Sequence, residues 1–455
     1  LLLFTSLISC EDYLEVDAPD HKIISSTLFE NDQTALSALA GLYNQLASVH
    51  FSGGGASSIT VLGALSTDIL MPIYSTSIPY MELEQNELSP NNFRNLDLWS
   101  SAFNILYMTN SLLEGASNSG SISEQVQNRI GGEASFVRAF TYFYLINFYG
   151  EIPLILTTDY QSNSLASRKS EDEIYRQITV DLQTAIDLLD SEYATGERTV
   201  VNQNTAVALM ARVQLFRKNW EDAEMFSSQI IDQGGTFELM EDLNSVFLAN
   251  SREAIWQLSP EGRGQSLTNT QEGANFLIHP LFYFLAQFKL EPNFVDSFSS
   301  GDKRLTDWIG FHEGTSYYFP YKYKIQNSTE EVTEYSMVMR LAEQYLIRAE
   351  VRAMQGDLPG AILDLDMIRE RAGLPLVNDT IPGIEQEELL NLIYEERKKE
   401  LFTEWGHRWL DLKRTGRAGE VLGAANPLWQ ETDVLYPIPE AERMTNPNLT
   451  QNDGY

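Results

Sequence analysis

The stretch LAEQYLIRAEVRAMQGDLPGAILDLDMIRERAG, residues 341–373, decides how the rest of the chain is interpreted. Its first half spaces Leu346, Ala349 and Ala353 three and four residues apart, which places them on one face of a helix. Gly356 then interrupts the spacing, as glycine commonly does where a helix ends. We therefore expect an amphipathic helix that ends close to residue 356.

The second half of the stretch predicts another helix, packed against the first. Asp357 is suited to capping its start, and Pro359 is tolerated in its first turn. A second apolar stripe follows at Ala361, Leu365 and Ile368. Because alanine lets two helices approach closely, the two stripes predict an antiparallel helical hairpin of the tetratricopeptide type.

The same pattern occurs 138 residues earlier, in the segment AVALMARVQLFRKNWEDAEMFSSQII, residues 206–231. Its matching positions are Ala211, Leu215, Asn219, Ala223 and Ile230, which align with Ala349, Ala353, Asp357, Ala361 and Ile368. A single hairpin cannot bury its apolar face alone, so a stack of such pairs is implied. Long segments separate the two copies. The expected fold is mainly α, a scaffold of tetratricopeptide-like helical pairs that carries a large insertion.

Helical periodicity also organises the rest of the chain. Further helices are expected at 27–48, 96–114, 123–149, 170–191 and 385–404. Ser170 is the expected cap of the fourth. The periodicity fades between 234 and 340. We divide the chain into an N-terminal helical region (27–233), an irregular region with room for short strands or helices (234–340), and a C-terminal region that holds the hairpin (341–455).

Aromatic side chains are concentrated in the irregular region. Between Phe276 and Tyr323 they make up 14 of 48 residues, or 29%, against 11% for the whole chain. Loops this long are usually functional or disordered, and such aromatic density argues against disorder. The irregular region is therefore the first place to look for a ligand site.

The composition is that of a folded and strongly acidic protein. The apolar fraction is 43%, and 64 acidic against 31 basic residues give a formal charge of −33. Such a surface repels phosphate backbones, which argues against nucleic acid as a partner. The charge serves solubility or, alternatively, provides an acidic face for calcium, although no EF-hand loop pattern supports the second interpretation.

The single cysteine, Cys10, ends a short apolar run, LLLFTSLIS, that is too brief to span a bilayer. With Leu7, Ile8 and Ser9 it fits a bacterial lipobox, in which the leader is removed before the cysteine and the thiol carries a lipid. We expect residues 1–9 to be a signal peptide truncated at its start, and 10–26 to be the lipidated cysteine with a polar tether. A stray cysteine in a leader is the alternative.

Six stretches occur in order along nearly the whole chain. They are Cys10, LWSSAFNILYMTN (98–110), EASFVRAFTYFYLINFYGEIPLI (133–155), RLAEQYLIRAEV (340–351), ERKKELFTEWGHRWLDLKRTG (396–416) and YPIPEAERMTNPNLTQNDGY (436–455). Together they resemble the SusD/RagB family, the surface nutrient-binding lipoproteins of Bacteroidota. No single piece is decisive, but the ordered set is specific.

This resemblance implies an α-helical fold with four tetratricopeptide-like helical pairs and an irregular region that carries the ligand site. It also implies a partner, a SusC-like TonB-dependent transporter that the lipoprotein covers like a lid. The implied location is the outer membrane, reached through the lipid anchor, with the protein facing the cell exterior. In the family, charged residues of the matching helices lock the scaffold, and here these are Arg138, Glu350, Arg397, Glu404, Arg408 and Asp411.

Catalytic patterns are missing from the sequence. The five histidines are scattered with no HExxH, and there is no Gly-x-Ser-x-Gly elbow and no phosphate loop. Among 64 carboxylates some pair always mimics the acid and nucleophile of a glycosidase, so carboxylate spacing carries no weight. We expect no enzyme activity, no catalytic residue, no cofactor and no metal site.

Sugar binding requires exposed aromatic faces on loops beside polar side chains. Two segments offer this combination, and the candidate ligand residues are Asp68, Tyr74 and Tyr80 in the first and Tyr283, Arg304, Trp308, Tyr317 and Tyr318 in the second. Trp308 is the preferred platform, and Trp99, in a helix of the family pattern, is a secondary candidate. The alternative for each aromatic is that it packs the irregular region onto the helices.

Three functions remain open at this point. The first is a cell-surface lipoprotein that binds an oligo- or polysaccharide and delivers it to the transporter. The second keeps this role with a peptide as the cargo, as in members that resemble RagB. The third is a tetratricopeptide scaffold that binds only proteins. This function would be favoured if the aromatic side chains of the irregular region were fully buried and the region had no pocket.

Overall fold

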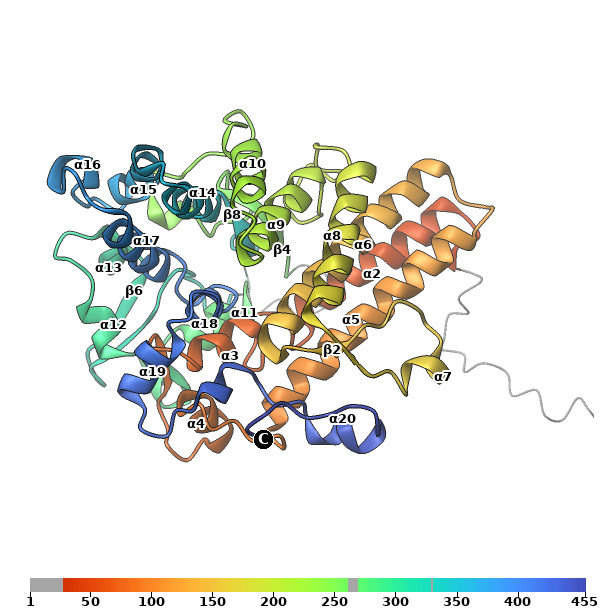
Figure 1. Cartoon of the computed structure of the whole chain (residues 1–455), viewed down its shortest axis with the longest axis horizontal. Coiled ribbons are helices and arrows are strands. Elements are labelled where there is room, and N and C mark those ends of the chain that lie inside the picture. Colours follow the sequence, from red (N-terminus) through yellow and green to blue (C-terminus); the bar gives the residue numbers. More distant parts are fainter. Residues whose placement is uncertain (1–27, 261–268, 329) are drawn as a thin grey trace, which may run out of the picture.

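Long helices in antiparallel pairs make up most of the computed structural model, which describes residues 28–260, 269–328 and 330–455 (Figure 1). The mainly α prediction is confirmed. The helices of the scaffold are α2 (Asp32–Ser48), α5 (Phe93–Asn118), α6 (Glu124–Tyr149), α8 (Glu171–Leu188), α9 (Gln203–Phe216), α10 (Trp220–Ile231), α14 (Leu341–Gln355), α15 (Leu358–Arg371) and α17 (Gln386–Glu400). Each helix packs against the next in this order, so the scaffold is one continuous stack.

Shorter elements connect and cover the stack. Before α9 they are α3 (Ile59–Leu65), β1 (Leu70–Pro72), α4 (Ile78–Glu84), β2 (Ile152–Pro153), α7 (Tyr160–Asn163) and β3 (Arg168–Lys169). Between α10 and α14 they are η2 (Leu243–Ser245), β4 (Ala254–Leu258), α11 (Gln271–Phe276), η3 (Tyr283–Leu285), β5 (Phe288–Leu290), α12 (Pro292–Asp296), α13 (Lys303–Asp307), β6 (Ile309–His312), β7 (Tyr317–Pro320) and β8 (Ser336–Arg340). After α15 they are α16 (Val377–Thr380), α18 (His407–Arg414), α19 (Ala418–Ala425), η4 (Glu431–Val434) and α20 (Glu440–Thr445).

The predicted hairpin at 341–373 forms as α14 and α15. Gly356 ends α14 in the left-handed conformation, at φ +86°, which a residue with a Cβ adopts only at a cost. The Asp357 side chain accepts a hydrogen bond from the Gly360 amide at 3.1 Å and caps α15, as expected. The earlier copy forms α9 and α10, and α10 packs against α14. There Asn219 does not cap, and its amide donates to the Gln214 side chain at 2.6 Å instead.

Helix α6 lies at the centre of the core. Phe136 and Phe140 are fully buried, and their ring centroids lie 5.2 and 5.1 Å from that of Trp256, which comes from β4. Strand β4 pairs with β8 in an antiparallel ribbon, and both strands are buried throughout. The two ends of the region 234–340 are therefore part of the main core, and only the chain between them lies outside the helical stack.

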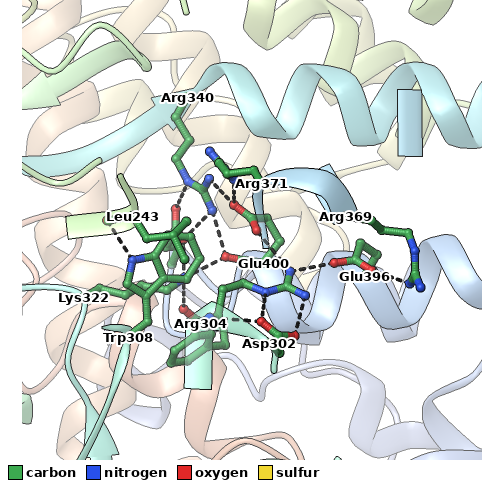
Figure 2. A network of polar contacts seen from close by, with 12 residues as sticks. Leu243, Asp302, Arg304, Trp308, Lys322, Arg340, Arg369, Arg371, Glu396 and Glu400 are labelled. Carbon is green, nitrogen blue, oxygen red and sulfur yellow. Dashed lines mark hydrogen bonds and ion pairs between the residues drawn. The ribbon is translucent and has the colours of Figure 1, made fainter. Parts of the chain in front are cut away.

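The chain between β4 and β8 is joined to the helical scaffold by a network of buried charges (Figure 2). We call it the charge network, and its members are Arg304, Lys322, Arg340, Arg371, Glu253, Asp302, Glu396, Glu400 and Glu404. The Glu400 carboxylate lies 3.1 Å from Arg304 and 2.6 Å from Arg340, and it also pairs with Arg371. Burial alone would raise the pKa of Glu400, but the three guanidiniums outweigh burial and hold it well below its usual range.

The charged residues assigned to scaffold locking all form ion pairs, but with partners from other parts of the chain. Arg138 pairs with Asp181 at 2.7 Å, across from α6 to α8. Arg408 binds the Asp68 carboxylate with two hydrogen bonds of 2.8 and 2.9 Å. The remaining pairs are Glu350 with Arg414, Arg397 with Asp411 and Glu404 with Arg340. Their role in holding elements together is confirmed.

Buried His407, at the start of α18, makes stability depend on pH. Burial lowers its pKa to about 4. The guanidiniums of Arg212 and Arg397 act in the same direction, against the carboxylates of Glu343 and Asp411. His407 is therefore neutral in the folded protein at neutral and mildly acidic pH.

We expect the folded state to lose stability between pH 7 and pH 5 because of His407. The unfolded chain takes up a proton at this residue near pH 6.5, whereas the folded protein does so only near pH 4. Since the unfolded state binds the extra proton, the free energy of unfolding falls as the pH drops, by about 2 kcal/mol over this interval. Denaturant unfolding at both pH values measures the loss, which His407→Gln should lack and the exposed His50→Gln should retain. Equal losses in all three proteins would contradict this account.

Two features of the chain bear on its relation to a membrane. Cys10 and the flanking residues of the expected signal peptide and tether lie outside the described residues. Within the described ranges, no helix is both long and apolar enough to cross a bilayer.

Candidate functional site

The structure buries the residue that was expected to be the main ligand platform. Trp308 has 0% of its surface exposed, and its indole N–H donates to the Leu243 carbonyl at 3.0 Å (Figure 2). Its ring lies 4.7 Å from the Lys322 ammonium, within the charge network. The expectation that Trp308 stacks on a ligand is therefore wrong, because the indole fills the space under the buried ion pairs.

Three further candidates are also engaged within the protein. Arg304 is fully buried and bound to Asp302 at 2.8 Å. Tyr80 is buried, with its ring 4.9 Å from that of Phe288. For Asp68, burial alone would raise the pKa, but Arg408 and Lys398 outweigh burial and lower it to about 2. These three residues hold segments together, and the prediction that they contact a ligand is wrong for the two that are buried.

Of the other four candidates, Tyr74 and Tyr283 are exposed, and Tyr317 and Tyr318 are half-buried on opposite faces of the β6–β7 hairpin. Tyr74 follows β1, and its hydroxyl donates to the Phe284 carbonyl at 2.7 Å. Tyr283 lies with its ring 5.3 Å from that of His312, which pairs with Tyr317 across the β6–β7 hairpin. Tyr74, Tyr283 and Tyr317, with the neighbouring Phe282, form a surface that we call the aromatic platform, whereas Phe311 and Tyr318 pair with each other on the opposite face of the hairpin.

Two short ribbons hold the aromatic platform in place. Strand β1 pairs with β5, and the Ile73 amide extends the pairing to the Gln287 carbonyl at 2.8 Å. The second ribbon is the β6–β7 hairpin, in which the rings of Phe311 and Tyr318 lie 4.8 Å apart. Gly310 is required there, because a Cβ at this position would lie 2.3 Å from the Phe319 ring. A small apolar cluster of Leu277, Ile278, Ala286 and Phe319 supports the platform from below.

The exposed segment 281–285, with the sequence LFYFL, is fixed by a histidine. The His279 Nδ1 accepts hydrogen bonds from the Leu281 and Phe282 amides, both at 3.0 Å. This geometry requires an unprotonated Nδ1 and turns the chain into η3. Leu281 and Leu285 are 74% and 68% exposed, which is unusual for aliphatic side chains held in a fixed turn.

A pocket of about 260 Å³ adjoins the platform and is lined by amide side chains. Its polar lining comes from Asn275, Gln287, Gln326 and Asn327, and Phe282 contributes an aromatic wall. Gln326 donates to the Leu277 carbonyl at 2.8 Å. The side-chain amides of Gln287 and Asn327 have no hydrogen-bond partner among the described residues, so they are available to a ligand. We call this hollow the amide pocket.

The chemistry of the site is that of binding. It combines ring faces, amide donors and acceptors, and the Lys289 ammonium, which lies 4.5 Å above the Tyr317 ring. Within the described ranges, no three His, Cys, Asp or Glu side chains are placed to hold a metal ion. Sequence reasoning missed the amide pocket because its members are spread over 53 residues and carry no shared pattern. The apolar run 281–285 was the available signal for this part of the site.

Two family models match the chain. One, described as the SusD family, matches residues 306–455, and the other, described as starch-binding and associating with the outer membrane, matches residues 12–215. The chain belongs to the SusD/RagB family. The matched ranges leave out residues 216–305, a segment that holds η3 and most of the lining of the amide pocket. The site residues there rest on geometry alone.

Individual SusD-like proteins agree with this assignment over their full length. A SusD-like protein of Formosa agariphila is 26% identical, over 100% of this chain and 97% of its own. A solved SusD superfamily protein of Bacteroides vulgatus has the same fold, with a TM-score of 0.82 at 22% identity, covering 94% of this chain and 100% of that one. The surface glycan-binding protein A of Bacteroides fluxus gives a TM-score of 0.76 at 25% identity, covering 93% and 99%.

Proposed function

We propose that this SusD-like protein binds a glycan chain on the aromatic platform, with part of the chain seated in the amide pocket. The observation that carries the proposal is the position of the exposed rings of Phe282 and Tyr283 beside a pocket in which the Gln287 and Asn327 amides lack partners among the described residues. One matching family is described as starch-binding and the Bacteroides fluxus protein as glycan-binding, and both descriptions support the same class of ligand.

The arrangement suits sugars for a physical reason. A sugar ring presents a flat face of C–H bonds that packs on an aromatic ring, while its hydroxyls need donors and acceptors at the edge. The exposed ring of Tyr283 offers such a face, and Gln287 and Asn327 offer both donors and acceptors. The platform therefore meets both requirements within one surface.

The cellular role that we propose follows from the family and from the N-terminal sequence. Lipidation at Cys10 would attach the protein to the outer membrane, with the platform at the cell exterior. From there the bound glycan would pass to a SusC-like TonB-dependent transporter. The lipobox around Cys10 and the family description, associating with the outer membrane, support this placement.

One observation favours a second candidate, a peptide cargo. Leu281 and Leu285 are exposed at the edge of the platform, and apolar side chains of a peptide would pack against them better than sugar hydroxyls would. The same amides would bind the peptide backbone. The two candidates differ in their contacts: a peptide would pack against Leu281 and Leu285, whereas a glycan would not need these two side chains.

The test is calorimetric titration of the protein from Glu11 onward against polysaccharides and peptides. We expect binding to at least one glycan, weakened about tenfold in Tyr283→Ala because one stacking face is lost. Tyr283→Phe keeps the ring and should bind within about twofold of the wild type. The exposed Leu363→Ala, on α15, serves as the remote control. Binding only to peptides, with loss in Leu281→Ala, would replace the glycan by the second candidate.

A further inference from the structure

Helix α5 carries an aromatic stripe on the side of the molecule away from the aromatic platform. Trp99, Phe103 and Tyr107 follow one another at intervals of four residues and so share one face. Their exposure rises along the helix, from 2% at Trp99 to 54% at Tyr107. The Trp99 and Phe103 rings lie 4.7 Å apart at an angle of 33°. The stripe thus begins in the core and emerges at the surface.

Two hollows flank this stripe, and Tyr107 lines both. The smaller has a volume of about 320 Å³, with Trp99 and Phe103 in its lining, and the larger has a volume of about 710 Å³. Tyr160, on α7, lines the smaller hollow and is 81% exposed. We call the two hollows and the ridge formed by Tyr107 the α5 groove.

The exposure of Tyr160 is not a result of a loose loop. The Glu114 carboxylate accepts hydrogen bonds from the Thr158 amide at 2.9 Å and from its hydroxyl at 2.5 Å. The Asn163 amide donates to the Thr157 carbonyl at 2.7 Å, and the Asn446 amide donates to the Ala166 carbonyl at 2.8 Å. The loop around α7 is fixed from both ends, so the ring is presented to solvent at a defined place.

Polar groups in the α5 groove are small and mostly neutral. The smaller hollow is edged by Thr158, Asn163, Ser164 and Thr445, which offer hydroxyls and amides. The charged members are carboxylates, Glu442 in the smaller hollow and Glu30 and Glu114 in the larger, and among the residues that the structure describes no Lys or Arg lines either one. Such a lining disfavours anionic ligands and suits the hydroxyls of a neutral sugar.

We propose that the α5 groove is a second glycan-binding site, taking a segment of a neutral polysaccharide across the Tyr107 ridge with Tyr160 as its second stacking face. The inference rests on the proposed function, since it assigns the same class of ligand to another part of the surface. Rings that alternate with hollows match a chain of rigid sugar rings.

The position of the α5 groove decides what a second site would do. Along the long axis of the molecule, α7 and α20 lie at the opposite side from β6 and α12, which belong to the part of the chain that carries the platform (Figure 1). A short oligosaccharide therefore occupies one site at a time. A polysaccharide can engage both sites at once. Its apparent affinity is then higher than at either site alone, because binding at the second site is intramolecular.

The experiment uses four proteins: wild type, Tyr283→Ala, the double variant Tyr107→Ala/Tyr160→Ala, and the triple variant. The first probe is the neutral polysaccharide that binds most tightly in a panel of amylose, laminarin, xylan and levan, and its binding is measured by affinity gel electrophoresis. The second probe is the hexasaccharide of the same glycan, and its binding is measured by calorimetry. We expect the double variant to bind the polysaccharide about tenfold more weakly and the hexasaccharide as the wild type does. Residual polysaccharide binding by Tyr283→Ala should disappear in the triple variant.

The outcomes separate the second site from the proposed function. If the double variant bound the polysaccharide as tightly as the wild type, the proposal of a second site in the α5 groove would be wrong, while the proposal for the aromatic platform would be unaffected. A platform variant that binds both probes normally, or a panel with no binding at all, would overturn the proposed function instead. Tyr107→Phe/Tyr160→Phe keeps the stacking faces and should bind as the wild type. Since both tyrosines are largely exposed, thermal unfolding of the double variant should be unchanged, which excludes misfolding as the cause.

Discussion

Glu400→Ala is expected to lower the free energy of unfolding by about 3–5 kcal/mol, or to prevent folding altogether. Glu400 is fully buried and pairs with Arg304, Arg340 and Arg371, which come from α13, β8 and α15. Removing its carboxylate leaves three buried guanidiniums with less negative charge than they need. The cost is that of uncompensated buried charge, and it exceeds the net contribution of the ion pairs themselves.

Denaturant unfolding monitored by circular dichroism measures this loss. Glu388→Ala is the matched control, because Glu388 lies on the same helix, α17, and is exposed. Its effect should stay within about 0.5 kcal/mol. A loss below about 1 kcal/mol in Glu400→Ala would mean that the charge network does not join the chain between β4 and β8 to the scaffold.

Local rules predicted the helical scaffold because its signals lie within a few residues of one another. Ser170 caps α8 in a capping box with Glu173, as its position before an apolar stripe indicated. Gly356 and Asp357 act as a stop and a start between α14 and α15. Asn219, at the matching position before α10, makes no cap hydrogen bond, and its side-chain amide donates to Gln214. Propensity identifies where a helix starts, while the partner of the capping side chain depends on the neighbours present.

The site could be predicted only in part, because exposure is a property of tertiary packing. Of the candidate residues, Tyr74, Tyr283, Tyr317 and Tyr318 are at least partly exposed, and their contact with a ligand stays a prediction. Aromatic density had pointed to the segment 276–323, which holds three of them. It could not separate Tyr283 from Trp308, since both lie in the same dense segment. Trp308 is buried because residues far apart in the sequence, such as Leu243 and Lys322, close around it. The β4–β8 pairing joins positions about 80 residues apart and leaves no local pattern either.

Trp308→Ala is the second large effect, and it separates stability from binding. We expect a loss of about 3–5 kcal/mol in the free energy of unfolding, because a fully buried indole is removed from under the charge network. Trp308→Phe keeps a ring beside Lys322 but leaves the Leu243 carbonyl without its donor, so about 1–3 kcal/mol should be lost. Both losses would be measured by denaturant unfolding.

The binding behaviour of the same variants decides the role of the indole. For Trp308→Phe, which should remain folded, the affinity for the best glycan of the panel is expected to equal that of the wild type. Tyr283→Ala should show the reverse, with normal stability and weaker binding, since its ring is already half exposed. A Trp308→Phe protein that is as stable as the wild type but binds the glycan poorly would contradict this assignment, because the indole would then contact the ligand rather than support the charge network.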